Sequence, residues 1–195
     1  MAVGAITVRP IHIAVGVLCA FFLLLAAGPA AQEAEAASAC KTWGSKESNE
    51  ITVGHARKAV LCLVNQERDQ HGVPDLHRDE RLQRAAQNHN DYMQNHRCFS
   101  HECAGERTLD SRLRNVGYLT SGLSRWGYGE NIAWGGQHLA TPRSIVNAWM
   151  RSSGHRANIL NPAFRDFGVG YTKGTPYAKN ANGAIFTTDF GLRVG

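Results

Sequence analysis

The chain has 195 residues, 43% hydrophobic and 19% charged, which excludes a wholly disordered protein and suits a single folded domain. Lys and Arg outnumber Asp and Glu by 21 to 16, so the formal net charge is +5. The cations are scattered, without a block of five or more. This pattern excludes a dedicated nucleic-acid-binding stripe and suits contact with anionic envelope polymers.

The N-terminus has the pattern of a secretion signal. Arg9 precedes an apolar run over residues 11–27, and small residues around Pro29 suit cleavage near Ala30. The run is shorter than the roughly 20 residues of a membrane span. We therefore expect residues 1–30 to be a cleaved signal peptide, leaving a secreted protein with no membrane segment; a retained membrane anchor is the alternative. Residues 31–52 form an Ala/Glu-rich spacer and N-terminal arm, and residues 53–195 form the domain.

Export changes how the cysteines are interpreted. Cys19 leaves with the signal, and the four that remain predict two disulfides in an oxidising compartment. Proximity along the chain favours Cys40–Cys62 and Cys98–Cys103 over the other two connectivities. A local zinc set of His96, Cys98, His101 and Cys103 is the alternative for the second pair.

Apolar residues at spacings of three and four predict four helices in the first three quarters of the domain. The first begins near Val53 and closes at Gly72, and the second is capped by Asp79 and continues past Met93. The third runs from Thr108 to Gly117. The fourth starts at Thr141-Pro142, turns Trp149 inward and stops at Gly154.

The periodicity changes after Asn161-Pro162. Phe167–Tyr171 and Ala184–Phe190 read as strands, and Asn182-Gly183 is typical of a hairpin turn. The glycine-rich segment Tyr118–Gly136 is predicted to be mostly loop, with one strand at most. Helices followed by strands indicate the α+β class, with an antiparallel sheet covered by helices.

Three short segments carry acid–base or metal-ligating side chains in loops or at helix ends: Cys98–His101, Gly129–Trp134 and Ser153–Leu160. With Leu63–Arg68 and the closing Asp189–Gly191, they make the sequence resemble bacterial members of the CAP superfamily, whose domain is also called the SCP domain. The resemblance covers about residues 53–195. It implies an α-β-α sandwich with a central antiparallel sheet and a large open cleft.

The resemblance also implies a binding site. The family's cleft is lined by a His–Glu–Glu–His tetrad, which carries over to His101, Glu130 and His155 in this sequence. The two histidines, His101 and His155, would hold zinc or another divalent cation. The second glutamate falls near Ser152, where this chain has no carboxylate, so one member of the tetrad is missing.

These residues favour a binding module over an enzyme. Two imidazoles with a nearby acid can hold Zn²⁺ with open positions, but neither a Gly-x-Ser-x-Gly nor a His-Glu-x-x-His motif is present. We assign no catalytic residue and expect a secreted module for a small or lipid-like ligand. The alternatives are an extracellular metal-dependent hydrolase with Glu130 as base, or an envelope-associated interaction protein with a vestigial cleft.

Structural explanations of the same residues stay open. His101 is then a loop histidine hydrogen-bonded to Glu130, His155 caps a helix C-terminus, and Asn131 satisfies backbone groups.

Overall fold

The computed structural model of the chain describes residues 38–195. The predicted signal peptide over residues 1–30 and the first part of the spacer lie outside the described residues. From residue 38 onward, none of the helices combines the length and the apolar character needed to cross a bilayer.

A four-stranded sheet forms the middle layer, with the strand order β1-β3-β4-β2. The long strands β2 (Arg125–Gly136), β3 (Asp166–Lys173) and β4 (Gly183–Val194) pair antiparallel. The two-residue strand β1 (His77–Arg78) adds to β3 in parallel. Because β4 lies in the centre, β2 is an edge strand, and it carries the Gly-Glu-Asn motif.

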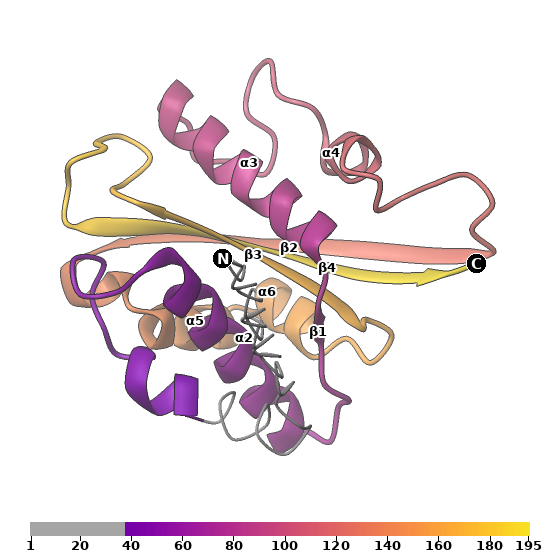
Figure 1. Cartoon of the computed structure of the whole chain (residues 1–195), viewed down its shortest axis with the longest axis horizontal. Coiled ribbons are helices and arrows are strands. Elements are labelled where there is room, and N and C mark those ends of the chain that lie inside the picture. The colour runs from indigo at the N-terminus through magenta and orange to yellow at the C-terminus, as the bar shows by residue number, and fades with distance from the viewer. Residues whose placement is uncertain (1–37) are drawn as a thin grey trace, which may run out of the picture.

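Helices cover both faces of this sheet (Figure 1). On one face lie α3 (Glu80–His96) and the short α4 (Leu109–Asn115). On the other face lie α2 (Val53–Gln70), α5 (Pro142–Arg151) and α6 (Ser153–Ile159). The 3-10 turn η1 (Gln137–Ala140) connects β2 to α5. This architecture confirms the expected α-β-α sandwich.

Side-chain caps begin the four predicted helices at the expected positions. Thr52, Asp79, Thr108 and Thr141 each accept a hydrogen bond from a backbone N–H in the first turn of the helix that follows. These bonds satisfy donors that have no partner inside the helix. Asp79 therefore fixes the start of α3, which positions part of the site described below.

Two glycines of β3 allow α3 to lie directly on the sheet. A Cβ at Gly168 would stand 2.2 Å from the backbone N of Gln83, and one at Gly170 would stand 2.4 Å from the carbonyl oxygen of Ala86. Any other residue there would push the helix away. The face of α3 that this contact buries includes His89.

The main core fills the space between the sheet and α2, α5 and α6, and includes Val60, Trp149, Phe167 and Phe186. Part of the N-terminal arm joins it, because Ala39, Cys40 and Ile51 are buried in the same cluster. The Cys40–Cys62 disulfide ties that arm to α2, and Cys98–Cys103 closes the second predicted bridge. Both pairings agree with the ones that proximity favoured.

Two predictions were wrong. The segment Tyr118–Gly136 is not mostly loop, since β2 pairs with β4 over twelve residues. Two of its glycines allow α6 and η1 to lie against the strand: a Cβ at Gly129 would meet Asn158 Oδ1 at 2.7 Å, and one at Gly135 would meet the Leu139 carbonyl oxygen at 2.5 Å. Gly154 also does not stop a helix. The break falls at the extended Ser152, and Gly154 lies inside α6.

Candidate functional site

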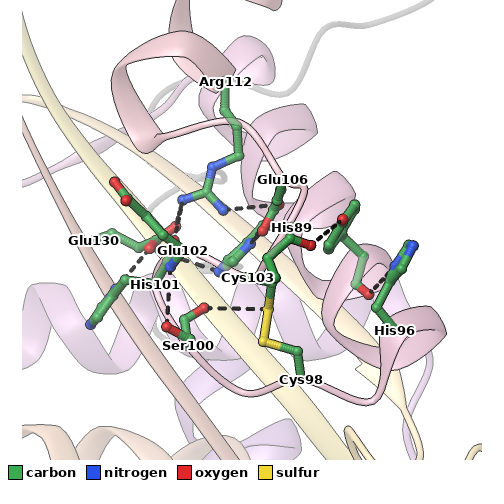
Figure 2. Close-up of a disulfide and its surroundings, with 12 residues drawn as sticks. His89, His96, Cys98, Ser100, His101, Glu102, Cys103, Glu106, Arg112 and Glu130 are labelled. Carbon is green, nitrogen blue, oxygen red and sulfur yellow. Dashed lines mark hydrogen bonds and ion pairs between the residues drawn. A yellow bond between two sulfur atoms is a disulfide. The ribbon is translucent and has the colours of Figure 1, made fainter.

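The loop between α3 and α4 carries His101, and a disulfide shapes it (Figure 2). The Cys98–Cys103 bridge joins residues five apart, with His101 between them. Cys103 is buried with Met93 of α3, Ile132 of β2 and Ile185 of β4, so the loop is anchored to the sheet. The bridge therefore uses these cysteines as a disulfide, and they are not a local zinc set.

His101 and Glu130 are in direct contact. His101 Nδ1 lies 2.8 Å from Glu130 Oε1, and the second carboxylate oxygen accepts a 2.7 Å hydrogen bond from Arg112 Nη2. The Glu130 side chain is only 2% exposed, whereas that of His101 is 54% exposed. The carboxylate is thus held in the interior, and it orients an imidazole ring that faces solvent.

A second histidine–glutamate pair lies behind the first and was not predicted. His89 of α3 is fully buried, and its Nδ1 lies 2.8 Å from Glu106 Oε1. Arg112 connects the two pairs, because its Nη1 also donates to Glu106 at 3.2 Å. Figure 2 shows the resulting chain of contacts from His89 through Glu106 and Arg112 to Glu130 and His101.

Asp189 of β4 adds a third buried carboxyl group to this region. It pairs with Glu130 across the strands, so both side chains project from the α3 face of the sheet. Neither of its carboxyl oxygens has a hydrogen-bond partner within residues 38–195. Burial, and then the charge of Glu130, raise the pKa of Asp189 well above its ordinary value. Both causes favour the neutral form of the Asp189 carboxyl group beside the Glu130 carboxylate.

The surroundings of Glu130 and His89 lower the pKa values of both groups. Burial raises the pKa of Glu130, but the hydrogen bond from His101 and the charge of Arg112 outweigh it, and the net shift is downward. Burial lowers the pKa of His89, since it disfavours the imidazolium. Glu130 is therefore an anion with both oxygens engaged, and His89 is a neutral ring.

His155 approaches from the other side of the edge strand. It is the third residue of α6, so the prediction that it caps a helix C-terminus was wrong. Asn131, whose side chain faces away from that of its neighbour Glu130, donates to the backbone carbonyl of His155 at 3.1 Å and accepts from Asn158 at 2.9 Å. These bonds hold α6 against β2, which is the structural role foreseen for Asn131.

Electrostatics relate the two proposed metal ligands to each other. Partial burial, and then the charge of His101, lower the pKa of His155. The two rings therefore lie within electrostatic range across the edge strand. Over residues 38–195, the His155 ring makes no hydrogen bond or ion pair with His101 or Glu130. The neutral ring is the form that binds a metal.

Few side chains near His101 and His155 could bind a metal ion. Among residues 38–195, no group of three or more His, Cys, Asp or Glu side chains is arranged to hold a metal ion. Ser152, at the position of the missing glutamate, separates α5 from α6 and contributes no carboxylate. A cavity of about 280 Å³ borders Glu106 and Arg112 between α3 and α4, and neither His101 nor His155 lines it. A closed structural zinc site takes four protein ligands, and the two predicted imidazoles supply only two.

Comparisons with known proteins agree with the fold and with the family resemblance. A family model described as the cysteine-rich secretory protein family (CAP) matches residues 61–190. The uncharacterized protein YkwD of Bacillus subtilis is 33% identical over 177 residues, which cover 84% of this chain and 62% of that protein.

Two solved structures share the fold. An extracellular protein containing a SCP domain from Bacillus anthracis is 28% identical, with a TM-score of 0.58 over 74% of this chain and 42% of its own. An outer surface protein from Borrelia burgdorferi is 22% identical, with a TM-score of 0.60 over 73% of this chain and 96% of its own. The chain thus spans less than two thirds of the length of YkwD and of the B. anthracis protein.

Proposed function

The chain belongs to the cysteine-rich secretory protein (CAP) family, and we propose that it acts outside the cell as a binding module and not as an enzyme. Three observations support an extracellular location: the signal-peptide pattern of residues 1–30, two disulfides, which persist in oxidising compartments, and relatives described as extracellular or outer-surface proteins.

The contact that carries the proposal is the one between His101 and Glu130. A metal-ligating histidine typically donates its second ring N–H to a carboxylate, which fixes the tautomer and the ring orientation. Here Nδ1 of His101 faces buried Glu130, so Nε2 is left for a ligand in solvent. We propose that His101 and His155 bind a divalent cation such as zinc, and that the cation supplies open positions for an external ligand.

The geometry favours this role over hydrolysis. A general base must reach a water or substrate proton, and both Glu130 oxygens are occupied, one by His101 and one by Arg112. Its pKa lies below the ordinary value, which weakens it further as a base. Glu130 therefore suits orienting His101 better than activating water.

The partners remain predictions. A small or lipid-like ligand would bind at the His101 side of the domain. An anionic envelope polymer would be attracted by the net positive charge, which is +5 for the whole sequence and +4 once Arg9 has left with the predicted signal peptide. If that attraction dominates, association with envelope material will weaken as salt rises toward physiological ionic strength.

Calorimetric titration of the secreted protein with zinc tests the proposal. Unaltered protein should bind zinc, and His101→Ala with His155→Ala should abolish binding. Glu130→Gln should weaken zinc affinity by about 10- to 100-fold, since it removes the carboxylate that orients His101. His77→Ala, at an exposed histidine of β1, is the matched control and should leave zinc affinity unchanged.

Undiminished zinc binding by the double variant would exclude this site. Any hydrolytic activity of the unaltered protein that Glu130→Gln abolished, with the zinc affinity retained, would favour the hydrolase instead.

A further inference from the structure

A small cavity is lined by residues of α2, β1, β3 and the start of α3. It lies at the β1 edge of the sheet, opposite the edge formed by β2. Its volume is about 130 Å³, which is room for a small ion and part of an apolar group but not for a drug-sized ligand. The cavity shares no residue with the His101 site.

Three cationic side chains line this cavity. Arg57 and Lys58 of α2 and Arg78 of β1 line it, and no acidic side chain lines it. The exposed Arg78 is paired with Glu80. Arg57 bonds instead to the amide oxygen of Gln87, at 2.6 Å from Nη2, and this bond does not neutralise its charge.

Arg57 is held at a cost that a bound anion would offset. Its Nε is buried without a hydrogen-bond partner, and an unsatisfied buried donor is destabilising. Burial, and then the charge of Arg78, lower the pKa of the Arg57 guanidinium. The carboxylates of Glu80 and Asp91 offset part of this repulsion. Two arginines beside one cavity, one of them with an unused N–H, are an arrangement that an oxyanion would stabilise.

The first turn of α2 adds to the positive potential of Arg57 and Arg78. Gly54 of that turn lines the cavity, and the turn contains no acidic residue. Thr52 caps this N-terminus with a neutral hydroxyl group, so no carboxylate of the first turn offsets its partial positive charge.

The floor of the cavity is apolar. Leu61, Phe167 and Val169 line it, and the latter two are buried. A free inorganic ion would leave this surface in contact with water, whereas an apolar substituent on the anion would cover it.

We propose that this cavity binds an organic oxyanion, a phosphate or carboxylate group that contacts Arg57 and Arg78 and carries a small apolar group that packs on Leu61, Phe167 and Val169. The site is separate from the zinc site, so either can exist without the other.

Calorimetric titration with phenyl phosphate at low salt tests whether the cavity binds the anionic group. Inorganic phosphate, benzoate and benzyl alcohol are titrated for comparison. Phenyl phosphate should bind more tightly than inorganic phosphate, and uncharged benzyl alcohol should not bind. Arg57→Gln and Arg78→Gln should each weaken phenyl phosphate binding about tenfold or more, the loss of a hydrogen bond to a charged group. Arg125→Gln removes an exposed arginine at the other edge of the sheet and should change nothing.

Leu61→Ala tests the apolar floor. It should weaken phenyl phosphate binding and leave inorganic phosphate binding unchanged. Circular dichroism of each variant checks folding. Because the Arg78 side chain is exposed, we expect Arg78→Gln to fold normally, so this variant tests binding even if Arg57→Gln does not fold.

Absence of saturable phenyl phosphate binding at millimolar concentration would overturn the site. Equal losses in Arg57→Gln, Arg78→Gln and Arg125→Gln would also overturn it, because they would indicate general attraction to a cationic protein. Inorganic phosphate binding as tightly as phenyl phosphate would overturn the apolar part. Comparing phenyl phosphate with benzoate decides between the phosphate and carboxylate classes.

Discussion

The two disulfides should differ in what their removal does, and the difference can be worked out from their positions. Their cysteines are 5 and 22 residues apart. In the chain-entropy model, closing these loops stabilises the fold by about 2.2 kcal/mol for Cys98–Cys103 and about 3.4 kcal/mol for Cys40–Cys62. Cys40 and Cys62 also lie in the main core, so their replacement loses packing as well.

The shorter bridge, however, is the one that shapes the loop carrying His101. We therefore expect Cys98→Ala with Cys103→Ala to cost less stability than Cys40→Ala with Cys62→Ala, but to lower zinc affinity more.

Urea unfolding measures the first quantity, and zinc calorimetry at a temperature where both double variants are folded measures the second. The reasoning is refuted if Cys98–Cys103 proves the more stabilising bridge, or if its loss leaves the zinc affinity unchanged while the other variant's affinity falls.

Packing and charge lead to three further predictions. Gly168→Ala should lower stability by about 1–3 kcal/mol, because its Cβ would overlap the backbone of α3. Gly154→Ala, in open space on α6, should raise stability by about 0.5–1 kcal/mol. Melting temperatures that shift in the same direction for both variants would contradict this reasoning. Arg112→Met leaves Glu106 and Glu130 buried without their cation and should cost about 3–5 kcal/mol. The matched control, Arg114→Met, breaks an exposed pair with Asp110 and should leave stability nearly unchanged, and comparable urea midpoints for the two variants would refute the role of Arg112. Burial raises the pKa of Asp79. Hydrogen bonds from the Arg81 side chain and from the backbone of Arg81 and Leu82 together lower it by more, so the folded-state pKa lies below the unfolded one. The stabilisation from ionised Asp79 is therefore present above about pH 3.9 and is lost as pH falls through the folded-state pKa. Asp79→Asn should make stability less sensitive to acid, which urea titrations at neutral pH and in acid measure. An unchanged pH dependence of stability would rule out this role of Asp79.

Local chemistry in the sequence determined much of the architecture. Thr52, Asp79, Thr108 and Thr141 begin their helices because a side-chain oxygen followed by an apolar period is enough to satisfy the first backbone donors. The order of helices and strands indicated the layered class, and cysteine spacing indicated the bridges. The motif residues His101 and Glu130 were identified through the family resemblance.

Tertiary structure decided the rest, because the deciding contacts join distant segments. The glycines of β2 are typical of a loop, and only the packing of α6 and η1 explains why the strand has glycine at Gly129 and Gly135. His89 lay on the apolar face of its helix and gave no sign of a partner, since Glu106 is 17 residues away and reaches it only after the loop folds back. Arg112, Glu106 and Asp189 have no shared motif, and they lie near one another only in a fold where α3 rests on Gly168 and Gly170. A buried charge network of this kind is a property of packing and not of any local pattern.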